Sequence, residues 1–495
     1  MDLRSSRSCL AALPSLFAFL LIFAGAACTV PLAPGYRILN QSREVRFVAG
    51  ENPQLHVDSR YTFENSGTTD LSFIDVSFPD ERSYGRGDLH IELNGREVTP
   101  AGLPEEYQSS SPNARRIEFH PVWKRGEKRD MSVAYAFRSP GPPESRITIG
   151  RDSFHLGSRG WTPVPQPPRH FLAPSPSRPG RTSYTVRVPS NFLVLARGRR
   201  SGRKQEGEET VYRFELREGD LAPFVVAGSY VASAPEGKAE AAIFWTFQPL
   251  QDDTRPALAR LTAAWQVLEK NFGQLDKNIR SPHIVESTAM RNHLTGESGP
   301  AAAAFPGGVL VDSQALAFGV GSEAFLEPAI HALAHNWFGD EVFFAPDAAL
   351  GMGEGLPEYA TIVVEESEKG EPGRRRRIVE YLNEYDRLRG QADETPLGVT
   401  MLTDPAGQRR IALAKAPLFF VALEDVCGEA PMRSGLKYLV TLLRGQETSY
   451  DALRSALEQS SGKNLAELFR VWLNDKGIPA DFRARYAVAA GNTRQ

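Results

Sequence analysis

Residues 331–359 read HALAHNWFGDEVFFAPDAALGMGEGLPEY, and this stretch is the most specific pattern of the chain for both fold and chemistry. His331 and His335 are four residues apart, so on a helix they lie one turn apart on the same face. Eighteen residues then separate His335 from Glu354. Two imidazoles and a carboxylate form a three-ligand zinc set that leaves a fourth position open to water or a substrate. The stretch therefore predicts a metal site with His331, His335 and Glu354 as ligands.

The residue after the first histidine is Ala332. In the HExxH zinc-peptidase pattern this position holds the glutamate that acts as general base. Because a methyl group cannot accept a proton, the sequence predicts a metal site that lacks the usual means of hydrolysis. Glu358 lies one turn beyond Glu354 and could serve as a substitute base, although a surface glutamate is the more ordinary interpretation.

An interpretation without metal has His331 and His335 in the core of an amphipathic helix, with Glu354 as a helix cap. We favour the metal because buried histidines need partners, and one ion supplies them for all three side chains. Trp337 and Phe338 are interpreted as core packing rather than as substrate contacts.

The first 28 residues predict an export signal. Two arginines precede an apolar run over residues 10–24, and three small residues lead to Cys28. This run is shorter than the ~20 residues that a membrane-spanning helix needs. The arrangement resembles a bacterial lipoprotein processing site, with Cys28 as the lipidated residue. Cleavage near residues 26 and 27, with Cys28 left as a free thiol, is the alternative.

Lipidation of Cys28 would tether the mature chain to a membrane surface without spanning it. Thr29 follows, with no aspartate to suggest inner-membrane retention, so we expect an exported protein of the bacterial envelope and prefer the outer membrane. The 57 basic and 60 acidic side chains nearly balance, so the sequence gives no electrostatic case for nucleic-acid binding. Cys427 would then be the only free thiol, which excludes an internal disulfide, and we interpret it as a packing residue.

The order of the periodicities predicts a multidomain α+β chain. Up to about residue 232 apolar residues alternate, most clearly at Met131, Val133, Tyr135 and Phe137, which predicts antiparallel strands. The segment 253–272 has helical spacing, and from residue 370 onward the pattern is again helical. Residues 448–451 match a capping box at a helix start, and the run 374–377, four arginines, indicates a solvated helix face.

The two histidines, Glu354 and the residues that flank them resemble the aminopeptidase-N-type gluzincin family. This family includes membrane alanyl aminopeptidase and leukotriene hydrolase. The family pattern is HExxH, eighteen residues, and then a glutamate within an NEGFAxY-like run. The chain matches this pattern at His331, His335, Trp337, Gly339, Asp340, Glu354, Gly355 and Tyr359. A weaker likeness extends over about residues 40–485. The resemblance implies a zinc ion held by the two histidines and Glu354, and it supports zinc over other divalent ions.

The export signal, the periodicities and the resemblance together predict the domain organisation. We expect a signal peptide with a lipoprotein-type cysteine at 1–28, a tether at 29–44 and an antiparallel β saddle-like domain at 45–235. A thermolysin-like metal-binding domain at 236–369, C-terminal helices at 370–485 and a tail at 486–495 should follow.

Two further departures from the family concern substrate binding. The family's GxMEN-type segment supplies a glutamate that holds the substrate's amino group, and two alignments place either Arg291 or Ala304 there. Neither is a carboxylate, and Arg291 would instead favour an acidic or C-terminal carboxylate group. The family's oxyanion-stabilising tyrosine lies two residues before a lysine, and if Lys415 is that lysine, Leu413 occupies the tyrosine position.

Three functions therefore remain open. The first is a zinc-binding envelope lipoprotein of this family with weak or absent hydrolysis, whose site binds a peptide or a partner protein. The second is an active zinc metallopeptidase with an unconventional base. The third is a metal-free structural envelope protein.

Overall fold

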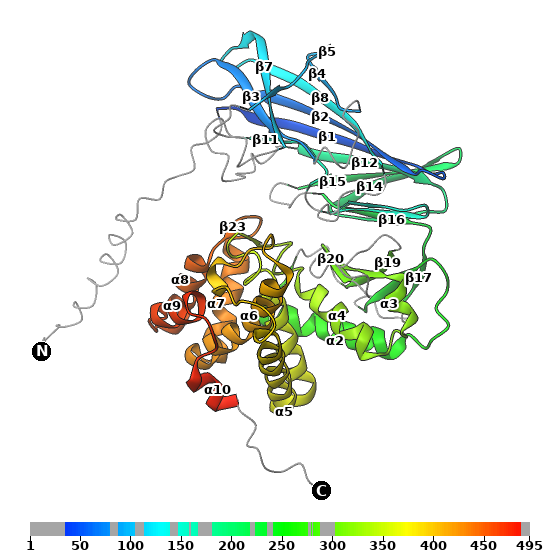
Figure 1. Ribbon diagram of the computed structural model, residues 1–495. Helices are drawn as coiled ribbons and strands as arrows, with labels where there is room; N and C mark the ends of the chain where they lie inside the picture. Colours follow the sequence, from blue (N-terminus) through cyan, green and yellow to red (C-terminus); the bar gives the residue numbers. More distant parts are fainter. Residues whose placement is uncertain are drawn as a thin grey trace, which may run out of the picture.

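The computed structural model describes residues 35–79, 88–103, 113–138, 147–157, 160–166, 181–217, 223–234, 241–275, 279, 281–287 and 302–486. Cys28, Arg291 and the expected signal peptide lie outside the described residues. Among the residues that are described, no helix is both long and apolar enough to cross a membrane. Figure 1 shows the N-terminal β-sheets at one end of the molecule and the C-terminal helices at the other. This is the predicted mixed α+β architecture, with a central part of mixed sheet and helices that lies beside the C-terminal helices.

The N-terminal part is built on one large twisted sheet. Residues Leu55, Val57, Tyr61 and Phe63 alternate on its buried face, as the period-two pattern requires. The strand order is β14 (Arg199–Glu206), β15 (Glu209–Leu216), β12 (Arg181–Pro189), β1 (Arg37–Val48), β2 (Gln54–Glu64), β8 (Lys128–Arg138), β4 (His90–Leu93) and β5 (Arg96–Glu97).

Two details of this part differ from the sequence prediction. The first strand begins at Arg37 and not after a tether that ends at residue 44, because alternating burial already starts there. Strands β1 and β12 pair in parallel, within a sheet whose other pairs are antiparallel. Alternation reports which face a side chain occupies and carries no information on the direction of the neighbouring strand.

Two four-stranded sheets cover the buried face of the large sheet and close its core. Trp123 and Trp161 lie in this core with almost no exposed surface. The sheet orders are β11 (Val164–Gln166), β3 (Leu71–Ser77), β7 (Ala114–Trp123), β6 (Ala101–Gly102) and β13 (Leu193–Ala196), β16 (Val225–Gly228), β10 (Ser153–Leu156), β9 (Ile147–Ile149).

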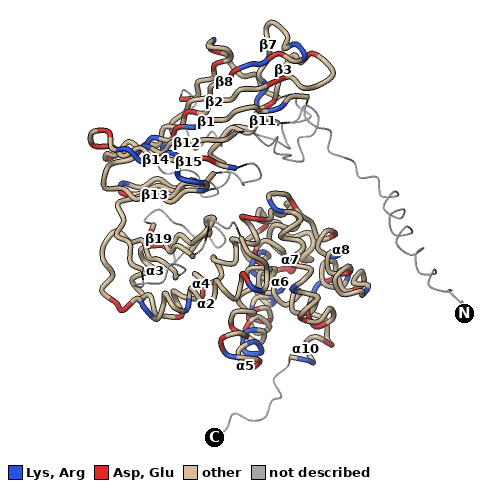
Figure 2. Tube along the Cα trace, turned by 180° about the vertical axis from the view of Figure 1, so that it is seen from behind, with Lys and Arg blue, Asp and Glu red and all other residues tan. Residues whose placement is uncertain are grey.

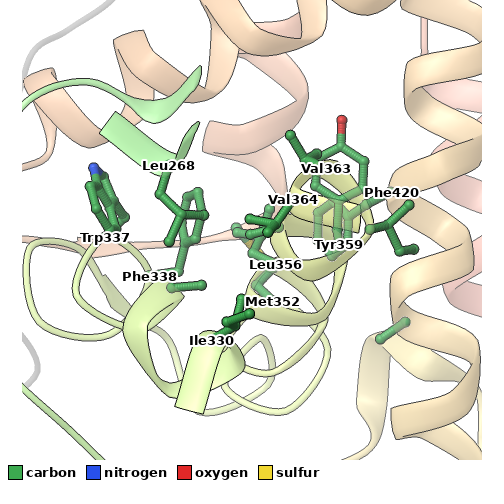
Figure 3. Close-up of a cluster of buried hydrophobic side chains, with 14 of the residues drawn as sticks. Leu268, Ile330, Trp337, Phe338, Met352, Leu356, Tyr359, Val363, Val364 and Phe420 are labelled. Atoms are coloured by element: carbon green, nitrogen blue, oxygen red, sulfur yellow. The ribbon is translucent and has the colours of Figure 1, made fainter. Parts of the chain in front are cut away.

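The central part has a five-stranded mixed sheet and the helices that pack beside it. Its strand order is β17 (Val231–Ser233), β18 (Ile243–Thr246), β19 (His283–Ser287), β21 (Gly308–Asp312) and β20 (Ala302–Phe305). The helices are α2 (Arg255–Phe272), α3 (Ser313–Ala317) and α4 (Glu323–Ala334). In Figure 3, Trp337 and Phe338 lie near Leu268 on one side of the buried cluster. Tyr359 and Phe420 lie on the other side of the same cluster.

Helix α5 (Gly355–Arg389) is two helices joined at Gly370, whose φ of 66° and ψ of −165° are not helical. Glu358 and Tyr381 are 23 residues apart and would lie about 35 Å apart on a straight helix, yet their side chains are hydrogen bonded. The chain therefore reverses at Gly370, and the two halves run side by side. A positive φ favours glycine here, since a side chain would be strained in this conformation.

The remaining elements complete the C-terminal helices. They are η3 (Leu397–Val399), α6 (Ala406–Cys427), α7 (Glu429–Leu442), α8 (Tyr450–Ser461), α9 (Ala466–Asn474) and α10 (Ala480–Tyr486), with a short parallel pair, β22 (Phe343–Phe344) and β23 (Glu447–Thr448). Cys427 is buried at the end of α6, as expected of a packing residue. The hydroxyl of Ser449, not that of Thr448, caps α8 by accepting from the Ala452 N–H.

The four-arginine run is only partly a solvated face, so this prediction was wrong for Arg374. That side chain is buried and forms an ion pair of 2.6 Å with Glu424 of α6. Arg433 of α7 lies 2.8 Å from the other oxygen of Glu424. The acceptor comes from another helix, so the charge run alone did not reveal it.

Candidate metal centre

The histidine helix is fixed by its cap and its apolar face. The Ser322 hydroxyl accepts from the Phe325 N–H at the start of α4. Phe325, Ala329 and Leu333 are buried in the main core. Beyond the helix end, Asn336 Oδ1 accepts from the Gly307 N–H at 2.6 Å, and its Nδ2 donates to the Gly308 carbonyl at 3.2 Å. These hydrogen bonds therefore fix the end of α4, and with it the two histidines, against the central sheet.

The three predicted ligands converge. Nε2 of His331 lies 3.0 Å from Nε2 of His335, and Oε2 of Glu354 lies 3.4 Å from each of these nitrogens. A tetrahedral zinc ion with bonds of about 2.0–2.1 Å places its ligand atoms about 3.3–3.4 Å apart. Among the described residues, this trio is the one group of histidine, cysteine and carboxylate side chains close enough to share an ion. The geometry fits zinc.

Each imidazole has an acceptor near Nδ1, the ring nitrogen that faces away from the ion site. Nδ1 of His335 lies 3.1 Å from the Phe338 carbonyl, which can only accept, so this nitrogen carries the hydrogen. Nδ1 of His331 lies 3.1 Å from Oε1 of Glu358. The first contact is a hydrogen bond and the second is a charge pair without hydrogen-bond geometry, and each favours a hydrogen on Nδ1, which leaves the Nε2 lone pair for a metal.

The pKa values of the ligands and of Glu358 show how the centre is charged when it holds no ion. Burial lowers the pKa of His331, but the carboxylates of Glu358 and Glu354 outweigh it and raise that pKa to about 10. Burial raises the pKa of Glu358, but His331 reverses this and brings it to about 2. The pKa of Glu354 is lowered too, since both histidines outweigh its burial. A proton on His331 therefore holds the metal-free cluster together, and a dication can replace it.

The structure corrects the interpretation of Glu358. This residue is not a surface glutamate, because its carboxylate contacts His331 and Tyr381. It is also badly placed as a substitute base, since it faces Nδ1 while an ion would lie at Nε2, on the opposite side of the ring. Ala332, at the position of the usual base, is 1% exposed and belongs to the main core.

The remaining candidate residues are less informative. Leu413 packs partly buried against the main core, and Lys415 Nζ donates to the Asp475 carbonyl at 2.7 Å. Ala304 lies on the edge strand β20 opposite Val309. Neither Leu413 nor Ala304 supplies a polar group. Arg291 lies outside the described residues.

Two aromatic residues next to the ligands serve packing, as predicted. Trp337 and Phe338 are fully buried, and the Trp337 Nε1–H donates to the Gly273 carbonyl at 2.6 Å. His283 of β19 accepts from the Trp245 Nε1–H at 3.1 Å, and burial lowers its pKa to about 4. Sequence reasoning missed the roles of Glu358 and Tyr381, since its only signal was a glutamate one turn beyond a ligand.

Comparison with known proteins agrees with this geometry. Residues 308–472 match the peptidase family M1 domain. The fold is similar to an M1 zinc metallopeptidase mutant of Deinococcus radiodurans, with 17% identity, a TM-score of 0.62, and coverage of 90% of this chain and 96% of that one. A mutant of the same Deinococcus radiodurans peptidase with a bound Tyr-Ser-Ala substrate gives 18% identity, a TM-score of 0.60, and coverage of 90% and 95%. No curated protein sequence matches the chain.

The fold is the one that these zinc metallopeptidases share, and the three converging ligands fit a zinc ion within it. More specifically, the chain carries a domain of peptidase family M1, which confirms the resemblance to the aminopeptidase-N-type enzymes. The prediction of zinc as the cofactor agrees with the zinc metallopeptidases of similar fold.

Proposed function

We propose that this protein is an exported envelope lipoprotein that holds zinc at His331, His335 and Glu354, hydrolyses peptides weakly or not at all, and binds a peptide or a partner protein. The observation that carries the proposal is the pairing of a well-formed ligand set with Ala332 at the base position. The ion would supply a Lewis acid for polarising a carbonyl group.

Convergence of the ligands supports zinc binding. Two Nε2 atoms 3.0 Å apart repel each other when both carry lone pairs, unless a proton or an ion lies between them. Both Nδ1 atoms already face acceptors, so the hydrogens are placed as a metal requires. A proton on His331 fills this role in the metal-free protein, and zinc can take its place.

The residues around the ligands support weak hydrolysis. General acid–base catalysis is worth ~10²–10⁴-fold and oxyanion stabilisation ~10²–10³-fold, so loss of both leaves little peptidase activity. Ala332 and Leu413 supply neither a proton acceptor nor an oxyanion donor. Glu358 faces the back of His331 and not the ligand-free side of the ion.

Peptide binding without turnover is the activity left to such a site. The similar Deinococcus radiodurans peptidase is observed as a mutant with a Tyr-Ser-Ala substrate bound. A three-ligand zinc ion has an open position that a peptide carbonyl can coordinate. If Arg291, which lies outside the described residues, lines the site, it would favour peptides with an acidic or C-terminal carboxylate group.

A digest of a broad peptide library tests the loss of hydrolysis. Zinc-loaded protein is incubated with the library, and products are followed by mass spectrometry, with Glu354→Ala as the matched control. We expect the same product pattern from both proteins and from a chelator-treated sample. Cleavage that disappears both with chelator and in Glu354→Ala would instead establish the second candidate, an active peptidase with an unconventional base. Retention of all three ligands is the observation that keeps this candidate open.

A further inference from the structure

Glu358 is the feature of the metal centre that the proposed function does not explain. It is not one of the three converging ligands, and its Oε1 lies 3.1 Å from Nδ1 of His331. Its other oxygen accepts a hydrogen bond from the Tyr381 hydroxyl. A partly buried carboxylate therefore bridges the back of a metal ligand and a phenol from a distant part of the chain.

Tyr381 reaches this position only because α5 reverses at Gly370. Glu358 belongs to the first turn of α5, and Tyr381 belongs to its second half. The two halves are also joined by ion pairs of Arg374 with Glu366, at 3.3 Å, and of Arg376 with Glu365. The hairpin thus holds the Tyr381 hydroxyl in a fixed place.

The second half of α5 also contacts α4, the helix of His331, directly. Arg377 lies 5.4 Å from the centre of the Tyr381 ring and forms an ion pair of 3.3 Å with Glu327 of α4. Glu327 is one turn before His331 on α4. The hairpin therefore contacts α4 at Glu327 and, through Tyr381 and Glu358, at the metal ligand itself.

We infer that Glu358 and Tyr381 are positioning residues for the metal ligand His331, an inference that rests on the proposed zinc centre. The Glu358 carboxylate keeps the hydrogen on Nδ1 and directs Nε2 toward the ion. Its negative charge also strengthens the donation from Nε2. The Tyr381 hydroxyl fixes the carboxylate in this orientation. Loss of such a partner weakens metal binding about 10–100-fold in characterised sites.

The test compares zinc dissociation constants at pH 7 by competition with a chromophoric chelator. Glu358→Gln should raise the dissociation constant about 10–100-fold. Tyr381→Phe, which keeps the ring, should raise it by a smaller factor. The matched controls are Glu384→Gln, on the exposed side of the same helix half, and Tyr438→Phe, which is also exposed; both should bind zinc as the wild type does.

A second readout separates positioning from a structural role. Melting temperatures are measured with and without the same excess of zinc, because a bound ligand stabilises the folded protein by an amount that grows with the logarithm of its concentration divided by the dissociation constant. A structural residue would lower both temperatures equally, whereas a positioning residue reduces the increase that zinc produces. If Glu358→Gln does not fold, Tyr381→Phe carries the test. Wild-type affinity in the folded variants would overturn the inference and leave the zinc centre intact, while a wild type that binds no zinc would remove the proposed function as well.

Discussion

At the scale of single residues, the metal trio could be predicted because its signal is local. His331 and His335 share one helix face by spacing alone, and the distance along the chain to Glu354 is a family pattern. The residue behind His331 could not be assigned in the same way. Glu358 looks like any glutamate of an exposed first turn, and only the position of α4 beside α5 shows that its carboxylate reaches Nδ1.

The raised pKa of His331 gives a prediction on the pH dependence of zinc binding. With a pKa of about 10, His331 carries a proton in the metal-free protein at neutral pH, and zinc must displace it. Zinc affinity should therefore rise up to about tenfold per pH unit between pH 7 and 9, and level off above pH 10. Chelator competition at constant ionic strength measures this slope. An affinity independent of pH over this range would show that no proton is displaced.

At the scale of elements, periodicity predicted strands and helices but not how they pair. The helical pattern after residue 370 was visible in the sequence, whereas the reversal at Gly370 depends on a backbone conformation that the pattern does not encode. The burial of Arg374 has the same cause, because its partner Glu424 belongs to α6. The parallel pairing of β1 with β12 likewise joins segments far apart in the chain.

The hairpin within α5 gives a prediction for Gly370. Its φ of 66° and ψ of −165° lie in a region that is essentially restricted to glycine, so Gly370→Ala should destabilise the protein by about 1–3 kcal/mol and weaken zinc binding by displacing Tyr381. Gly390→Ala is the matched control, since Gly390 has a φ of −78° and open space around its Cβ position. Urea denaturation and zinc competition measure both effects. Equal stability of the two variants would show that the turn at Gly370 tolerates a side chain.

At the scale of the whole molecule, the metal centre lies where the central sheet and the C-terminal helices meet. Asn336 ties the histidine segment to the sheet, and Glu341 contacts Arg444, beyond α7, at 2.5 Å. Lysine, arginine and acidic residues are interspersed along the chain in Figure 2. The β-part and the C-terminal helices could be predicted from periodicity, since each has one dominant period, whereas the central part mixes strands and helices.

The proposed attachment to the envelope concerns the whole protein and would depend on Cys28. We expect the mature chain to begin at Cys28 with lipid on its N-terminus, and the protein to fractionate with membranes. Cys28→Ser should release it to the soluble fraction, and Cys427→Ser, the matched control, should not. Mass spectrometry of the N-terminal peptide identifies the modification. An unlipidated mature chain in the soluble fraction would contradict the lipoprotein assignment.

The metal content of the purified protein tests the central claim most directly. After equilibration in zinc-supplemented buffer and removal of free metal, elemental analysis should find about one zinc ion per chain, as expected for one three-ligand site. The same measurement on His331→Ala should find much less. A folded wild-type protein that retains no more zinc than His331→Ala would contradict the account.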